Sequence, residues 1–263
     1  MIMSAEIWAG AILGAVVSAI IIPLCVSGLL WLRRWWVESR PSRQLLEGIA
    51  QQGEPCLVFI RDFFITLDPQ NPLNTPLQAV EPRKGVGVIP NVSELWADVD
   101  ARGLAYTLNV LGQAGKTKNV SLLRMSEDPG LWNAHIVVIG GQSQKSFDFY
   151  DRLENVMYYM DGGNIYEAET RAIVARESGY GYGVILKARN KLKTQGSPGV
   201  GLLIGGFGTL GTAAAGYYLK EHFRDLGRQF GKRCFGIIVR ASVAAGEESV
   251  ERLTQYDRVE AKS

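Results

Sequence analysis

Residues 200–215 of this chain have the sequence VGLLIGGFGTLGTAAA, which contains the clearest structural pattern in the chain. The first five residues form an apolar run of the kind that makes a buried strand. Four glycines then follow at 205, 206, 208 and 211, and Thr212 opens a stretch of helical spacing that reaches Phe230. A strand, a glycine-rich turn and a helix in this order form the repeating unit of α/β proteins.

Further apolar runs on both sides of this stretch predict more buried strands. We therefore expect an α/β fold with a Rossmann-like open sheet, mostly parallel, with helices on both faces. A turn at 161–164 between two apolar runs predicts a small antiparallel hairpin beside that sheet. In such a sheet the ligand lies outside the carboxyl ends of the strands. The predicted strands are 56–60, 120–125, 135–139, 183–188 and 235–240, with a helix over 93–112.

The N-terminal part contains 26 apolar residues without a charge, from Ile7 to Leu32. This length predicts a transmembrane helix, because about 20 apolar residues cross a bilayer. A cleaved signal peptide is the alternative, but the positive charges at Arg33 and Arg34 follow the run instead of preceding it. The positive-inside rule then places the N-terminus outside and the body in the cytoplasm. We expect a single-pass protein of the inner or plasma membrane, with a span at 7–32, a juxtamembrane linker at 33–54 and a ligand-binding domain at 55–263.

Charge and cysteine content exclude several classes of protein. The chain has 28 Lys and Arg against 26 Asp and Glu, and this balance argues against direct nucleic-acid binding, which needs a concentrated basic face. Three distant cysteines predict no disulfide framework. Two histidines without CxxC or HExxH spacing predict no metal site. Five prolines within residues 68–91 predict an irregular segment that covers a ligand or contacts a partner.

The glycine-rich turn carries the sharpest functional signal. Gly206, Gly208 and Gly211 match G-x-G-x-x-G, and the helix behind them presents free N–H groups to an anion. Thr209 and Thr212 add hydroxyl groups. A dinucleotide site also needs an acidic residue at the end of the next strand. Arg240 stands there instead, which argues against NAD and favours a phosphate.

A second glycine turn follows the strand at 135–139. Its glycines, serines and lysine are suited to a second phosphate, and the two turns together would hold a nucleotide-type ligand whose identity remains unknown. Tight packing between strand and helix is the structural alternative for both turns. Arg61 and Asp62 follow the first predicted strand, at 56–60. They either face the ligand or form an ion pair with each other at the surface. The candidate ligand-binding residues are Arg61, Asp62, Gly140, Gly141, Ser143, Lys145, Gly205, Gly206, Gly208, Thr209, Gly211, Thr212 and Arg240.

The segment Gly205-Gly206-Phe207-Gly208-Thr209 resembles the G-G-x-G-T loop of the LOG-like nucleotide-processing family and its sensor relatives, the SLOG domains. This resemblance implies a Rossmann-like, nucleotide-binding domain. In the enzymes of that family a Glu stands three residues after the Thr and supports phosphoribohydrolase chemistry. Thr212 occupies that place here, so the resemblance implies a ligand sensor and argues against hydrolysis.

Three functions follow from these observations. The first is a membrane-anchored sensor or effector that binds a nucleotide-derived ligand and acts as a homo-oligomer on the lipid bilayer, by analogy with bacterial antiviral defence. The second is a membrane-tethered nucleotide hydrolase or glycosidase, with Asp62 or Glu169 as its carboxylate. The third is a membrane scaffold that holds a partner protein. No residue is assigned a catalytic role, and enzymatic activity stays open.

Overall fold

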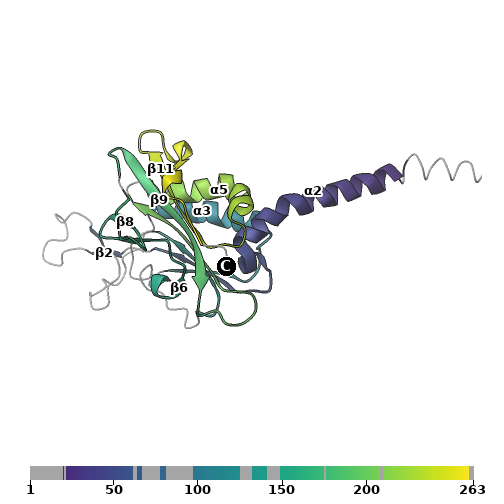
Figure 1. The fold of residues 1–263 in the computed structure, drawn as a ribbon, viewed down its shortest axis with the longest axis horizontal. Helices are drawn as coiled ribbons and strands as arrows, with labels where there is room; N and C mark the ends of the chain where they lie inside the picture. Colours follow the sequence, from purple (N-terminus) through teal and green to yellow (C-terminus); the bar gives the residue numbers. More distant parts are fainter. Residues whose placement is uncertain are drawn as a thin grey trace, which may run out of the picture.

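The computed structural model describes residues 20, 22–61, 64–66, 78–80, 97–124, 132–140, 149–174, 176–207 and 210–260 (Figure 1). A nine-stranded sheet forms the centre of this part of the chain. Its strand order is β12-β11-β9-β10-β5-β1-β4. Two further short strands complete it: β13 pairs with β11, and β6 pairs with β9. Helices α3 and α5 lie together on one face, while α2 projects away from the body (Figure 1).

The elements have the following bounds. The helices are α2 (Ile22–Leu46), α3 (Asp98–Gln113) and α5 (Gly211–Phe230), with short 3-10 turns η2 (Glu47–Ala50), η3 (Glu247–Ser249) and η4 (Thr254–Tyr256). The main sheet contains β1 (Cys56–Ile60), β4 (Val120–Arg124), β5 (His135–Ile139), β6 (Leu153–Glu154), β9 (Tyr180–Asn190), β10 (Val200–Phe207), β11 (Phe235–Ser242), β12 (Glu251–Arg252) and β13 (Arg258–Val259). Two separate hairpins are β2 (Phe64–Thr66) with β3 (Gln78–Val80), and β7 (Tyr158–Asp161) with β8 (Asn164–Glu167).

The inner strands of the sheet are buried on both faces because their side chains alternate between two cores. On β10, Leu202 and Ile204 belong to the core under α3 and α5, whereas Leu203 belongs to the core on the opposite face. The β7–β8 hairpin covers that opposite face with Tyr158, Met160 and Ile165. The core on the helix side also includes Leu45, Leu46 and Ile49, which come from the end of α2 and from η2.

The prediction of a mostly parallel, Rossmann-like sheet is wrong. Strand β1 is parallel to β4 and β5, and β5 is parallel to β10. Strand β9 lies between β10 and β11 and is antiparallel to both, and β6, β12 and β13 add further antiparallel pairs. The sheet is therefore mixed and mostly antiparallel. Helices α3 and α5 share one face, while the β7–β8 hairpin and Phe149, from the helical residues 149–151, belong to the core on the other face.

The predicted transmembrane helix over residues 7–32 also needs correction. In the described ranges, none of the helices combines the length and the apolar character that crossing a membrane requires. Helix α2 begins at Ile22 and continues past the apolar run through Arg33, Arg34, Glu38, Arg40 and Arg43. The uncharged part of this helix is therefore 22–32, eleven residues, whereas a spanning helix needs about 20. The finding contradicts the predicted span and the single-pass membrane placement derived from it. Residues 7–19 and 21 of the predicted span lie outside the described residues.

Candidate functional site

The carboxyl ends of the parallel strands β1, β5 and β10 meet at one edge of the sheet. Arg61 directly follows β1, and Gly140 directly follows β5. The Gly140 N–H donates a hydrogen bond of 2.9 Å to the carbonyl of Ile204 on β10. Next to Ile204, Gly205 lies so close that an added Cβ would stand 2.7 Å from the Gly140 carbonyl oxygen. The strand ends preceding the two predicted glycine turns are therefore adjacent.

A buried carboxylate lies at this edge. Asp100, in the first turn of α3, has no exposed surface. Its Oδ2 accepts a hydrogen bond of 3.0 Å from Arg61 Nε and lies 2.9 Å from Arg61 Nη2. Its Oδ1 is also buried and has no hydrogen-bond partner among the described residues. Arg61, Asp100 and Gly140 are called the rim cluster below.

Glycine is required at position 140 of the rim cluster. Its φ is +109°, a backbone conformation that other residues rarely adopt. A Cβ at this position would lie 3.2 Å from Arg61 Cβ and 3.4 Å from Asp100 Oδ2. The absence of a side chain therefore leaves the backbone in close contact with the ion pair.

Helix α5 begins beside the rim cluster. Its N-cap residue Leu210 makes no side-chain capping bond, and no acidic residue lies in the first turn. The first N–H groups of a helix have no intrahelical partner and attract anions. Thr212, in this first turn, packs against Gly103, one helical turn beyond Asp100 on α3. This contact brings the positive end of α5 close to the Asp100 carboxylate.

Two glycines of the G-x-G-x-x-G motif have a packing role. An added Cβ on Gly206 would stand 2.5 Å from the Tyr182 carbonyl oxygen, and one on Gly211 would stand 2.3 Å from it. These glycines let the start of α5 lie directly on β9 and β10. Thr212 is buried as well, with 2 % of its surface exposed. Close packing between strand and helix, the structural alternative to ligand binding, is therefore sufficient to require glycine at positions 206 and 211.

The structure brings six predicted site residues together at this edge of the sheet: Arg61, Gly140, Gly205, Gly206, Gly211 and Thr212. Arg240 lies at the same edge but two strands away, because β9 separates β11 from β10. It forms ion pairs of 2.6 Å with Glu177 and 2.5 Å with Glu251, and hydrogen bonding to Glu251 raises its pKa above the usual range. Six other predicted residues lie outside the described residues: Asp62, Gly141, Ser143, Lys145, Gly208 and Thr209.

Asp100 is the site residue that the sequence interpretation missed. Asp98 and Asp100 resemble a solvated acidic face, and Asp98 does have an 82 % exposed side chain paired with Arg102 one turn later. Asp100, however, precedes the buried Leu104 by four residues. Residues four apart share one helix face. This spacing from a buried leucine was the sequence signal that distinguishes the buried Asp100 from the exposed Asp98.

A second polar cluster resembles a nucleophile triad but lacks its geometry. His135 Nε2 lies 3.2 Å from Ser197 Oγ and 3.9 Å from Glu54 Oε2. Its Nδ1 accepts a hydrogen bond from the Val200 N–H, so the proton of the neutral ring is on Nε2. In a triad the nitrogen facing the serine must accept a proton while the other is held by a carboxylate. Burial, followed by the nearby Lys193 charge, lowers the pKa of His135 to about 4, and the cluster is structural.

Comparison with known proteins adds no family or relative to this description. No protein-family model, no curated protein and no solved structure matches this chain.

Proposed function

We propose that this protein binds a nucleotide-type ligand at the rim cluster and acts as a sensor of that ligand. The observation that carries the proposal is the Asp100 carboxylate, which is buried at the carboxyl edge of the sheet with Oδ1 unpartnered among the described residues. A buried charged oxygen without a hydrogen bond is costly, because it has lost its hydration. A ligand hydroxyl or N–H group would remove that cost.

The surrounding groups favour a ligand with both hydroxyl and phosphate groups. Asp100 Oδ1 can accept a hydrogen bond from a ribose hydroxyl, as acidic residues do in dinucleotide sites. The start of α5, where Leu210 makes no side-chain capping bond, offers backbone N–H groups and a positive dipole to a phosphate. A ribose phosphate provides these two groups within one small unit. The resemblance to the LOG-like and SLOG domains at Gly205 and Gly206 suggests the same class of ligand.

Sensing is favoured over hydrolysis by the residues in the described part of the rim. Thr212, which replaces the glutamate of the LOG-like enzymes, is buried against Gly103. Asp100 is held by Arg61 in an ion pair. Glu169, one of the two carboxylates considered for a hydrolase, lies exposed in the turn after β8. Asp62, the other, lies outside the described residues.

Binding to the full chain tests this proposal. Nucleoside mono- and diphosphates, NAD and cyclic oligonucleotides are added to the purified protein, and thermal shift and calorimetry identify a ligand. Asp100→Asn removes the charge but keeps the shape, so we expect binding of that ligand to weaken at least about tenfold, as for the loss of a charge-assisted hydrogen bond. Asp98→Asn, on the same helix, makes the same chemical change on an exposed side chain and should bind like the wild type.

Two outcomes contradict the proposal: no binding across this panel, or equal binding by Asp100→Asn and the wild type. Hydrogen exchange of the wild-type protein provides a test that does not depend on the folding of a variant. The ligand should protect amides at 139–140 and 210–214. Chromatography of the products distinguishes sensing from hydrolysis, since turnover of any panel compound would favour the enzyme. Ligand-dependent self-association stays a prediction, to be followed by light scattering in the same samples.

A further inference from the structure

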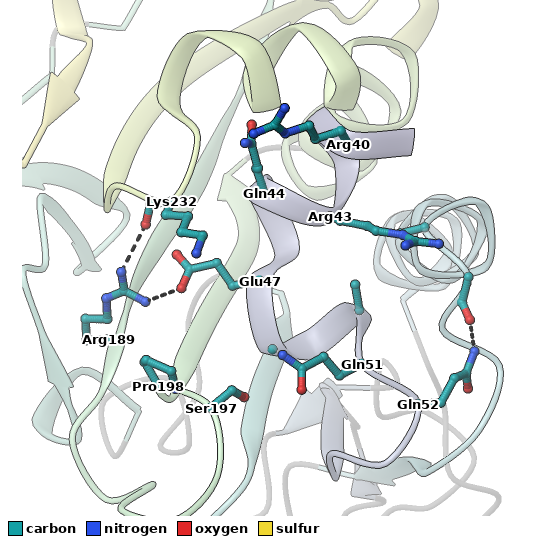
Figure 2. A pocket seen from close by; sticks show the side chains of 14 residues that line it. Arg40, Arg43, Gln44, Glu47, Gln51, Gln52, Arg189, Ser197, Pro198 and Lys232 are labelled. Atoms are coloured by element: carbon teal, nitrogen blue, oxygen red, sulfur yellow. Dashed lines mark hydrogen bonds and ion pairs between the residues drawn. The ribbon is translucent and has the colours of Figure 1, made fainter. Parts of the chain in front are cut away.

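A basic pocket lies at the opposite edge of the sheet, where the parallel strands begin. It has a volume of about 850 Å³ and is lined by the end of α2, by η2, by Arg189 near the end of β9 and by residues just before β1, β4, β10 and β11. Figure 2 shows Arg40, Arg43 and Gln44 on α2 above the pocket, with Glu47, Arg189 and Lys232 along one side. The rim cluster lies at the other ends of these strands, so the two sites are separate.

The charge of this pocket is strongly positive. Four of its lining side chains are cationic, from Arg40, Arg43, Arg189 and Lys232, and Glu47 is the one acidic residue among them. Glu47 is already neutralised, because its two carboxylate oxygens lie 2.9 Å from Lys187 Nζ and 2.7 Å from Arg189 Nη1. With four cations against one carboxylate, the lining has a net charge of +3, which attracts anions.

The positions of these cations suit a ligand with several charges. Arg40 and Arg43 lie about one turn apart on α2, and Lys232 follows α5 on the other side of the pocket (Figure 2). The exposed Lys232 ammonium has no ion-pair partner among the described residues. Arginine forks and a lysine point charge are the side chains that bind phosphate groups.

We infer that this pocket binds a small molecule with several phosphate groups, and that the phosphates provide most of the affinity. The volume falls in the range of small-molecule sites. No aromatic side chain lines the described pocket, so it offers no surface on which a base could stack. The chemistry thus favours a polyphosphate group over a nucleobase as the recognised part.

Calorimetry with inorganic tripolyphosphate on the full chain tests this inference. We expect binding that weakens as salt is raised, because exposed charges are screened. Lys232→Gln should weaken binding at least about threefold, and adding Arg40→Gln and Arg43→Gln should bring the total loss to at least about thirtyfold, as expected for the loss of charge-assisted contacts. Lys191→Gln removes one exposed charge outside the lining and should change the affinity less than about twofold.

Two results would overturn the inference: no heat and no thermal shift with millimolar tripolyphosphate, or an equal loss with Lys191→Gln and Lys232→Gln. The second result would show attraction to the overall charge of the protein. Hydrogen exchange provides a readout that needs no variant, since tripolyphosphate should protect amides at 45–52 and leave those at 139–140 unchanged. The Asp100→Asn variant should bind tripolyphosphate like the wild type, so this test can fail or succeed independently of the rim cluster.

Discussion

His135 is held between two hydrogen bonds that determine which ring nitrogen carries the proton. The Val200 N–H donates to Nδ1 over 3.2 Å, and Nε2 lies 3.2 Å from Ser197 Oγ. A second proton on Nδ1 would face that N–H and break the bond. Burial and the positive charge of Lys193 oppose the second proton further, and the pKa falls from 6.5 to about 4.

This residue predicts a pH dependence of stability. Between pH 6.5 and 4 the unfolded chain binds a proton at His135 that the folded protein does not bind, so the free energy of unfolding falls as the pH falls. The full shift corresponds to about 3 kcal/mol. Urea denaturation at pH 7.0, 6.0, 5.0 and 4.5 measures the slope.

A matched variant separates His135 from the other groups that titrate in acid. His135→Asn keeps an acceptor for the Val200 N–H and cannot be charged in this range, so its free energy of unfolding should depend less on pH than that of the wild type. His222→Asn makes the same change at a histidine on α5 that contacts the Tyr218 ring, and serves as the control for the substitution itself. Equal slopes for His135→Asn and the wild type would contradict the assignment.

At the scale of elements, helices α3 and α5 cross at two glycines. An added Cβ on Gly216 would stand 2.9 Å from the Gly103 Cα and 3.0 Å from the Gly103 carbonyl oxygen. One on Gly103 would stand 2.9 Å from Thr212 Cγ2. The two backbones therefore touch directly, and this contact fixes where the first turns of α3 and α5 lie relative to the rim cluster.

Gly216→Ala should push these helices apart and destabilise the protein by about 1–3 kcal/mol, as overpacking does in cores. Gly112→Ala, in α3, places the same methyl group where nothing lies within 4 Å and should increase stability by up to about 1 kcal/mol through helix propensity. Denaturant unfolding of the two variants provides the comparison. A stability gain in both variants would contradict the close crossing.

The sequence predicted the positions of the strands more accurately than their directions in the sheet. The runs at 56–60, 135–139 and 200–204 are strands, and the long helix begins one residue before the predicted Thr212. A continuously apolar strand reports burial on both faces, and this burial does not distinguish parallel from antiparallel strands. Here the β7–β8 hairpin covers the second face, so β9 is buried along most of its length while it runs antiparallel between β10 and β11.

The sequence predicted the parts of the candidate site that lie at strand ends, but not the parts that tertiary packing brings together. Gly140 and Gly205 were predicted as site residues because each follows an apolar run, and their strands are neighbours in the sheet. The pairing of Arg61 with Asp100 joins residues 39 positions apart. Sequence spacing alone gives no reason to place these two side chains together. The basic pocket is similarly assembled from four parts of the chain that are distant in the sequence, within 40–52, 114–115, 189–198 and at Lys232.

At the scale of the whole molecule, one buried ion pair joins the N-terminal segment to the sheet. Glu47, the first residue of η2, has a φ of +45°, which is uncommon for a residue other than glycine. Its 8 % exposed carboxylate lies between Arg189 and Lys187, whose side chain is 1 % exposed. Burial lowers the pKa of Lys187, while the Glu47 charge opposes this shift. The ion pair thus allows a lysine to remain inside the protein.

Glu47→Gln should therefore cost more than the loss of a surface contact. It leaves the Lys187 ammonium buried without its counter-charge, and removing one partner of such a pair costs about 3–5 kcal/mol. Glu221→Gln removes a carboxylate from a surface pair with Lys220 and should change stability by less than about 0.5 kcal/mol. Denaturant unfolding measures both changes at pH 7.

The double variant Glu47→Gln/Lys187→Met isolates the cause. Methionine removes the stranded charge and fills similar space, so much of the lost stability should return. The contact between the N-terminal segment and the sheet should not recover in the same way. Both variants carry glutamine at position 47, so the ion pair with Arg189 is lost in each of them. Hydrogen exchange at 45–50 should therefore stay faster than in the wild type even when global stability is recovered. Equal exchange in wild type and double variant would mean that Leu45, Leu46 and Ile49 hold this segment by apolar burial alone.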